Sequence, residues 1–431
     1  MTNDLRDKLR QLGVTKGTAN IKPAPLPRRK RPIESLVDGQ EIESAMGRAF
    51  FALERYAPDH RHGDLALGAL VTQKTSVAAQ LGREPALADV DLKRAAFLDT
   101  ETTGLSGGTG TLAFLVGLGT FEADRRKSKG TAFHLRQFFL RDPDEEAAML
   151  SALSDLMQDR QALVTFNGRG FDLPLLQTRY TLARMRPAWL SLPHLDLLAP
   201  SRRVWRDRLV SCALSSLELN VLGVRRTHED VPSFMIPQMY LDYLRTGDAG
   251  DMARVIYHNR YDILSMVTLA TLLCRLFDNP LEQATHPADL VSLGKWYDDL
   301  GLTEQAERAL RAVTAPGESR SRALTHLGWL LKRQERREEV VAVWKQLAES
   351  NLLDVTAHIE LAKHYEWHAD DLEQALAWTQ AALDLAAKWP RGIERDSARD
   401  ELAHRRERLE RKLKRSTTSH PDLPKEKSPT G

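Results

Sequence analysis

Three closely spaced stretches rich in apolar residues predict β-strands. The stretches are AAFLDTE, LAFLVGLGTF and FHLRQFFL, at residues 95–101, 112–121 and 133–140. Short polar or glycine-rich segments join them, which predicts consecutive antiparallel strands. Helical periodicity follows at 144–157, and a helix at 174–185 separates expected strands at 162–167 and 194–198. The whole pattern predicts an α/β domain, a mixed sheet flanked by helices, over residues 41–280.

A different pattern, with a period of 34 residues, covers residues 286–395. Three leucines stand 34 residues apart, each followed by a small residue: Leu293 and Gly294, Leu327 and Gly328, Leu361 and Ala362. A small residue lets two helices approach closely, and large residues fill the groove beside it. The period resembles that of the tetratricopeptide repeat, which implies an all-α domain of stacked helix pairs. An unrelated helical bundle is the alternative.

Both ends of the chain are polar. Residues 1–40 include KPAPLPRRKRP, and the prolines and clustered positive charge predict a disordered basic arm. It would be a solvated linker or a tail that touches nucleic acid. Residues 396–431 predict a charged helix followed by a disordered tail.

Composition narrows the class of protein. The chain has 431 residues and a net charge of +2, so overall charge predicts no strong attraction to nucleic acid or membrane. Its two cysteines, Cys212 and Cys274, have no metal-type spacing and make no disulfide framework, which fits a cytoplasmic protein. No window reaches the apolar length of a membrane span.

Four carboxylates are the candidate catalytic groups. In FLDTETTGL, strand alternation places Asp99 and Glu101 on one face, where they repel each other unless a cation or proton lies between them. Asp172, in FNGRGFDLPLL, opens a helix, and capping is its simplest role. Asp262 lies in the helical stretch RVIYHNRYDILSMV and alone would be a solvated side chain. Together the four predict a pocket that holds two divalent cations, which suits phosphoryl transfer.

The order and separation of DTETTGL, FNGRGFDLPLL and HNRYD resemble the three exonuclease motifs of the DEDD superfamily, which has a ribonuclease-H-like fold. The stretch HLDLLAPSRRVWRDRLVSCALSSLELNVLG resembles the YprB-type branch, a group of predicted exonucleases in which a tetratricopeptide-like C-terminus occurs. The resemblance covers residues 90–280 best.

The resemblance implies a 3′–5′ exonuclease that uses two Mg²⁺ or Mn²⁺ ions. Asp99 would bridge both ions, Glu101 and Asp262 would hold the one that activates water, and Asp172 would reach the other. The residues expected at the nucleic acid are Thr102, Thr103, Leu105 and Asn167. Whether the substrate is DNA or RNA stays open, and the repeats are expected to dock a protein partner or a second part of the substrate.

One departure concerns the residue that assists the attacking water. One branch of the superfamily has a His five positions before the last Asp, and the other has a Tyr four positions before it. Here the two are exchanged, with Tyr257 at five and His258 at four. Four residues of a helix return to nearly the same face, so His258 shares a face with Asp262. Since imidazole accepts a proton near neutral pH, we expect His258 to be the base or water-orienting group.

Two further functions and two local features stay open. A non-catalytic adaptor on a nuclease-like fold would have no need of a repulsive carboxylate cluster, and ribonuclease-H-like folds also host endonucleases. In SRRVWRDRL, Trp205 would either stack a nucleic-acid base among arginines or be a buried core residue. Asp196 would either support the site or end a strand through hydrogen bonds.

Overall fold

The computed structural model describes residues 31–104, 110–124, 130–227, 229–350 and 354–418. Contacts divide the chain into two compact units. The N-terminal unit comprises the chain up to Ala79, Glu84–Leu197 and Glu218–Ala270. The C-terminal unit comprises Gln80–Arg83, Leu198–Leu217 and the chain from Thr271 onward. The division therefore lies about ten residues before the boundary expected near 280, and residues 198–217 pack with the C-terminal helices.

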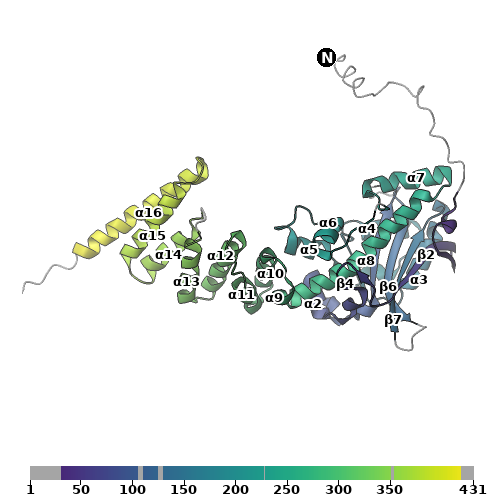
Figure 1. Cartoon of the computed structure of the whole chain (residues 1–431), viewed down its shortest axis with the longest axis horizontal. Coiled ribbons are helices and arrows are strands. Elements are labelled where there is room, and N and C mark those ends of the chain that lie inside the picture. The colour runs from purple at the N-terminus through teal and green to yellow at the C-terminus, as the bar shows by residue number, and fades with distance from the viewer. Residues whose placement is uncertain (1–30, 105–109, 125–129, 228, 351–353, 419–431) are drawn as a thin grey trace, which may run out of the picture. The chain divides into compact units, whose positions relative to one another are not determined.

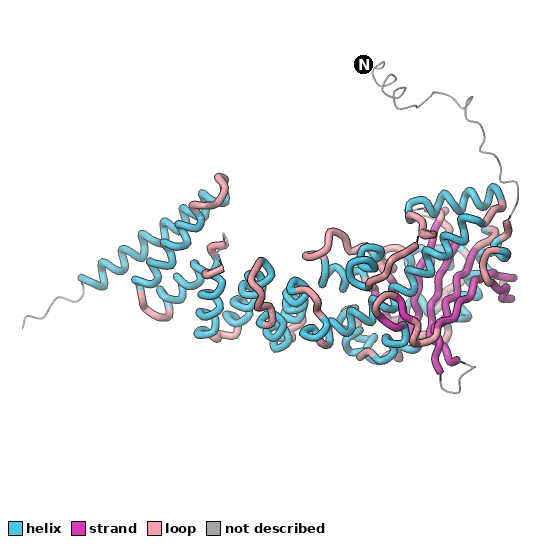
Figure 2. The backbone as a smooth tube through the Cα atoms, viewed as in Figure 1, coloured by secondary structure: helices cyan, strands magenta, loops and turns pink. Residues whose placement is uncertain are grey.

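A seven-stranded sheet forms the centre of the N-terminal unit (Figure 2). In spatial order its strands are β1 (Gly39–Ser44), β2 (Gly47–Tyr56), β7 (Gly130–Phe139), β6 (Ala113–Asp124), β5 (Ala95–Thr102), β8 (Ala162–Thr165) and β9 (His194–Asp196). β5 pairs with β8 and β8 with β9 in parallel, whereas the other neighbours are antiparallel. The predicted mixed sheet, with its three consecutive antiparallel strands, is confirmed.

Strands β1 and β2 extend the sheet beyond what the hydrophobic pattern indicated. β2 continues the sheet along β7, with Phe51 opposite Phe138. The 3-10 helix η2 (Ile33–Ser35) and the first residues of β1 fall inside the segment expected to be a disordered arm. Arg31 is also fixed, because its guanidinium forms two hydrogen bonds with the carboxylate of Asp248, at 2.7 and 2.9 Å. Residues 31–40 are thus part of the folded unit, and the rest of the expected arm lies outside the described residues.

Helices α3 (Glu146–Met157), α4 (Asp172–Leu182) and α7 (Ile236–Thr246) contact strands of this sheet (Figure 1). Most of α8 (Gly250–Asp278) and the first part of α2 (Thr75–Gly82) also belong to the N-terminal unit, and a two-stranded ribbon is formed by β3 (Arg61–His62) and β4 (Leu65–Ala66). α3 contacts β1 and β2, and it is joined to α4 where the Tyr180 hydroxyl donates to the carbonyl of Leu150 at 2.8 Å.

Two glycines let helix α8 approach the sheet. Gly117 and Gly119 stand two apart on β6 and therefore point to one face. A Cβ at Gly117 would lie 2.3 Å from Oδ1 of Asn259, and one at Gly119 would lie 2.7 Å from Ile263, both on α8. The sequence LVGLG thus provides the bare surface on which α8 rests, beside the strand that carries Asp99.

The described part of the C-terminal unit is helical. Its helices are α5 (Leu198–Trp205), α6 (Leu214–Leu217), α9 (Pro280–Gln283), α10 (Pro287–Asp299), α11 (Thr303–Arg311), α12 (Glu318–Arg333), α13 (Arg337–Ala348), α14 (Thr356–Trp367), α15 (Leu372–Ala386) and α16 (Ile393–Thr418). From α10 to α15 they contact one another in successive pairs, α10 with α11, α12 with α13 and α14 with α15.

Small residues stand where these helices meet. A Cβ on Gly294 would lie 2.7 Å from Leu310, and one on Gly328 would lie 2.4 Å from Trp344. The predicted all-α region is confirmed, and its identification as tetratricopeptide-like stays a prediction. α16 covers the expected charged helix.

Trp205 belongs to the core of the C-terminal unit. Its side chain has no exposed surface, and α5, which ends with it, packs on α10. Arg208 nearby pairs with Asp289 at 3.0 Å. A fully buried indole cannot stack on a base, so the core interpretation of Trp205 holds. Among the described helices, none combines the length and the apolar character that a bilayer span requires.

Candidate functional site

Asp99 and Glu101 lie on the face of β5 that α8 covers. Asp99 stands opposite Gly117 of β6, and Glu101 stands opposite Leu115, so both carboxylates share one side of the sheet. The side-chain amide of Asn259 donates to Oδ2 of Asp99 at 2.8 Å. Asn259 is fully buried and accepts in turn from Gln137 at 2.8 Å, which fixes the direction of its amide. Asp99 is therefore held in one orientation from the helix above it.

Asp172 reaches the same place from the start of α4. It is the first residue of the helix, and Phe171, not Asp172, is the N-cap. The Asp172 carboxylate instead accepts a hydrogen bond from the Thr100 hydroxyl at 2.5 Å. Thr100 stands between the two acids in sequence, and the negative charge of Asp172 acts on both Asp99 and Glu101. The capping role is thus not the one that this side chain fills.

Asp196 shapes the loop that delivers Asp172. Its two carboxylate oxygens accept from the backbone N–H groups of Asn167 and Arg169, at 2.8 and 3.0 Å. Asn167 has a left-handed backbone with φ of 68°, a conformation that asparagine tolerates better than most residues. These bonds agree with both interpretations of Asp196, because it ends β9 through hydrogen bonds and also holds the loop that leads to Asp172.

Asp262 and His258 face Glu101 from one turn of α8. Nε2 of His258 lies 3.4 Å from Oδ2 of Asp262 and 4.0 Å from Oε1 of Glu101. One ligand atom from each of the three side chains falls within 4.8 Å of the others, close enough to share a single cation. The four-residue spacing thus places His258 beside Asp262, as helix geometry predicts.

Three of these carboxylates, those of Asp99, Glu101 and Asp172, have a raised pKa. Burial raises the pKa of Asp99 well above its ordinary value, and the negative charges of the other three acids raise it further. Burial likewise raises the pKa of Glu101, with added repulsion from Asp262 and Asp172. Burial also raises the pKa of Asp172, to about 6. Divalent cations bound by these oxygens would remove this repulsion, so the donor set fits hard ions such as Mg²⁺ or Mn²⁺.

An arginine that the sequence motifs did not indicate completes the site. Arg226 binds Glu218 through two hydrogen bonds of 2.7 Å, and its Nη2 also pairs with Oδ1 of Asp262. Glu218 is buried and accepts a further bond from Ser265 at 2.6 Å. This network leaves Oδ2 as the oxygen of Asp262 that faces His258. Neither Arg226 nor Glu218 carries a local sequence signal, because each is defined by partners on other elements.

Asp230 is a second residue that the sequence motifs did not indicate. Its Oδ1 lies 2.7 Å from Nδ1 of His258, on the side of the ring opposite Glu101 and Asp262. The same oxygen lies 3.3 Å from Nη1 of Arg226. The polar stretch RRTHED, which ends with Asp230, was a visible but unspecific signal.

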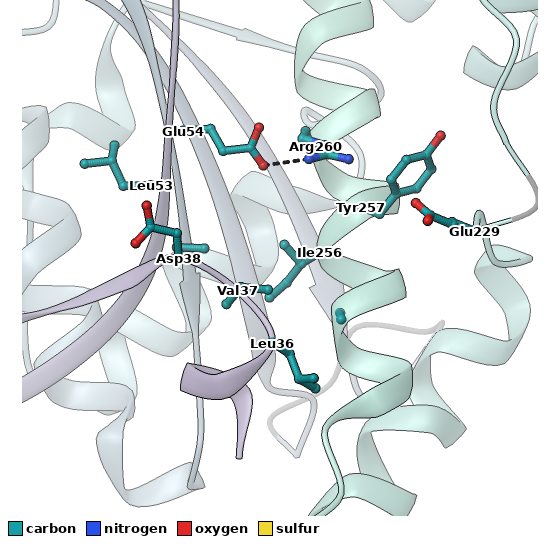
Figure 3. Close-up of a pocket in the computed structure, with 11 residues that line it drawn as sticks. Leu36, Val37, Asp38, Leu53, Glu54, Glu229, Ile256, Tyr257 and Arg260 are labelled. Carbon is teal, nitrogen blue, oxygen red and sulfur yellow. Dashed lines mark hydrogen bonds and ion pairs between the residues drawn. The ribbon is translucent and has the colours of Figure 1, made fainter. Parts of the chain in front are cut away.

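The side chain of Tyr257 makes its hydrogen bonds away from the four acids. Its hydroxyl accepts hydrogen bonds from the backbone N–H and the hydroxyl of Thr227, at 3.1 and 3.2 Å. Its ring lines a pocket of about 360 Å³, together with Arg260 and Glu54, which pair at 2.7 Å (Figure 3). The lining of this pocket includes none of the four carboxylates. Tyr257 therefore anchors the loop that carries Arg226 and does not face the acids.

The expected substrate residues surround the end of β5 and the following loops. The hydroxyl of Thr102 donates to the carbonyl of Gly104 at 2.7 Å, and that of Thr103 accepts from the backbone of Leu112 at 3.0 Å. The backbone N–H of Thr103 also donates to the carbonyl of Leu112, at 3.0 Å, so both threonines are held by local hydrogen bonds. Asn167 is exposed, and Leu105 lies outside the described residues.

Comparison with known proteins gives two matches. A family profile described as the RNase_H superfamily matches residues 96–274, which contain all four carboxylates. "Uncharacterized protein YprB" of Bacillus subtilis (strain 168) is 33% identical over 296 residues, which are 68% of this chain and 69% of that protein. The matched profile spans the sheet from β5 to β9 and most of α8.

Proposed function

Since the chain belongs to the RNase_H superfamily, we propose that it is a metal-dependent 3′–5′ exonuclease. The observation that carries this proposal is the convergence of Asp99, Glu101, Asp172 and Asp262. An adaptor gains nothing from gathering four carboxylates that repel one another, whereas an enzyme needs them to hold cations. Nucleic acid is the expected partner, with DNA and RNA both open.

Each side chain has a part in the proposed hydrolysis of a phosphodiester bond. Two Mg²⁺ or Mn²⁺ ions, when bound by the four carboxylates, supply the positive charge that activates water and stabilises the leaving oxygen. His258 presents Nε2 to this space and accepts the proton of the attacking water or orients that water. The backbone at Thr102 and Thr103, with Asn167 across the site, would hold the terminal nucleotide.

End-labelled single-stranded and duplex DNA and RNA, incubated with the pure protein and Mn²⁺, Mg²⁺ or a chelator, test the proposal. A ladder that shortens from the 3′ end with Mn²⁺ or Mg²⁺, and stops with chelator, is the expected result. Internal cuts would mean an endonuclease on the same site. Tight binding without cleavage in either metal would mean an adaptor and would overturn the proposal.

Variants of the site residues distinguish cleavage by this protein from cleavage by a contaminating nuclease. Asp99→Asn and Glu101→Gln should each abolish cleavage, because each removes a cation ligand and keeps the size of the side chain. Asp242→Asn is the matched control, since the Asp242 side chain is 46% exposed and pairs with Arg245 at the surface. His258→Ala should lose turnover, and wild-type turnover in that variant would remove His258 from the mechanism.

The C-terminal helices and the two cysteines bear on partners and localisation. We propose that the helix pairs from α10 to α15 dock a protein partner or a second part of the substrate. We also propose a cytoplasmic setting, with which two free thiols, Cys212 and Cys274, are consistent.

A further inference from the structure

We infer that Asp230 is a positioning residue that fixes the tautomer and the ring orientation of His258. The inference rests on the proposed function, in which His258 works through Nε2. It concerns a residue that lies outside all three sequence motifs.

The hydrogen-bond partners of the imidazole decide which nitrogen carries the proton. Nδ1 lies 2.7 Å from Oδ1 of Asp230, and a carboxylate oxygen can only accept. This contact is shorter than the 3.1 Å from Nδ1 to Nη1 of Arg226 and the 3.4 Å from Nε2 to Oδ2 of Asp262, so it favours the tautomer with the proton on Nδ1. Nη1 of Arg226 lies 3.1 Å from the same nitrogen, but guanidinium can only donate. Both donors thus converge on one oxygen of Asp230, and the arginine reinforces the negative charge there.

The other nitrogen is then left as an acceptor. Nε2 lies 3.3 Å from the hydroxyl of Ser233, which can donate to it, and it faces Asp262 and Glu101. A lone pair on Nε2 is what the proposed proton acceptor requires. If the proton were on Nε2, this nitrogen would donate a hydrogen bond to the water and could not accept the proton of the water. Asp230 therefore stabilises the tautomer that leaves the lone pair on Nε2. Carboxylates orient catalytic and metal-binding histidines in other enzymes in the same way.

The loop that carries Asp230 is itself anchored. Thr227 donates twice to the hydroxyl of Tyr257, and Arg254 donates to the carbonyls of Glu229 and Asp230, at 3.3 and 3.2 Å. These bonds set the backbone on both sides of the arginine–aspartate pair. The Tyr beside His258 thus acts on it indirectly, through the loop.

Nitrogen-15 NMR of histidine-labelled full-length protein tests the tautomer directly. The protein is kept free of metal and substrate, at a pH where imidazole is neutral, and His258→Gln identifies the signals of His258. Wild-type protein should show the proton on Nδ1, and Asp230→Ala should lose that signature. A proton on Nε2 in the wild-type protein would overturn the inference even if Asp230→Ala failed to fold.

Turnover gives the second readout. Asp230→Ala should lower kcat by about 10- to 100-fold with little change in KM, because the ring is misdirected and the substrate contacts remain. Glu229→Gln is the matched control, since it removes the same charge from the neighbouring position. Unchanged kcat or an unchanged tautomer in Asp230→Ala would refute the positioning role. If the tautomer is as expected but the wild-type protein cuts no nucleic acid, the proposed function fails and the positioning stands.

Discussion

Replacing Gly117 by alanine should damage both the stability and the site, because one added methyl group collides with the residue that holds Asp99. The new Cβ would lie 2.3 Å from Oδ1 and 2.9 Å from Nδ2 of Asn259. The amide cannot swing away freely, since Asn259 has no exposed surface and its amide is bonded to both Gln137 and Asp99.

The cost follows from these contacts. Overpacking of a well-filled core costs about 1–3 kcal/mol, and each hydrogen bond of Asn259 that is lost adds about 0.5–1.5 kcal/mol. We therefore expect a loss of about 2–4 kcal/mol from the free energy of unfolding, and a Tm lower by roughly 5–10 °C. Because Asn259 would no longer orient the carboxylate of Asp99, the affinity of the site for cations should fall by about tenfold or more.

Thermal and urea unfolding, followed by circular dichroism, measure the first effect, and Mn²⁺ titration calorimetry measures the second. Gly110→Ala is the control, since a Cβ there meets nothing within 4 Å. A double-mutant cycle with Asn259→Ala isolates the collision: Gly117→Ala should cost at least about 1 kcal/mol less when Asn259 is already truncated. Equal costs in both backgrounds, or a Tm matching that of Gly110→Ala, would refute the explanation.

Three further predictions address other parts of the structure. Burial raises the pKa of Asp172 to about 6, so its contribution to metal-free stability is complete below its unfolded pKa near 3.8 and is lost as pH rises through about 6. The loss is on the order of 3 kcal/mol, and Asp172→Asn should flatten the profile in urea titrations across this window. Tyr257→Phe should lower the Tm, because Thr227 loses two bonds to the hydroxyl, while kcat changes less than in His258→Ala. Gly328→Ala should destabilise the helix pairs by about 1–3 kcal/mol, since its Cβ would lie 2.4 Å from the Trp344 ring, and calorimetric Mn²⁺ affinity should stay unchanged.

Local sequence patterns predicted those strands and helices that depend mainly on neighbouring residues in the chain. Apolar runs bounded by turn residues located β5, β6 and β7, and a 34-residue repeat located the helix pairs. β1 and β2 were not predicted from the sequence. β1 has no residue that is fully buried, and β2 joins the sheet by pairing with β7, which is distant in sequence. The interpretation of Trp205 as core required knowing that α5 packs on α10.

For the candidate site, the motifs predicted the four acids, and helical spacing predicted that His258 lies beside Asp262. The contacts that hold these side chains could not be predicted in this way. Asn259 meets Asp99 across 160 positions and Arg226 meets Asp262 across 36, while Asp230 meets His258 across 28. Such contacts depend on how elements pack, so no local pattern carries them. The packing of α8 against two glycines of β6 brings His258 and Asp262 close to Glu101 and places Asn259 against Asp99.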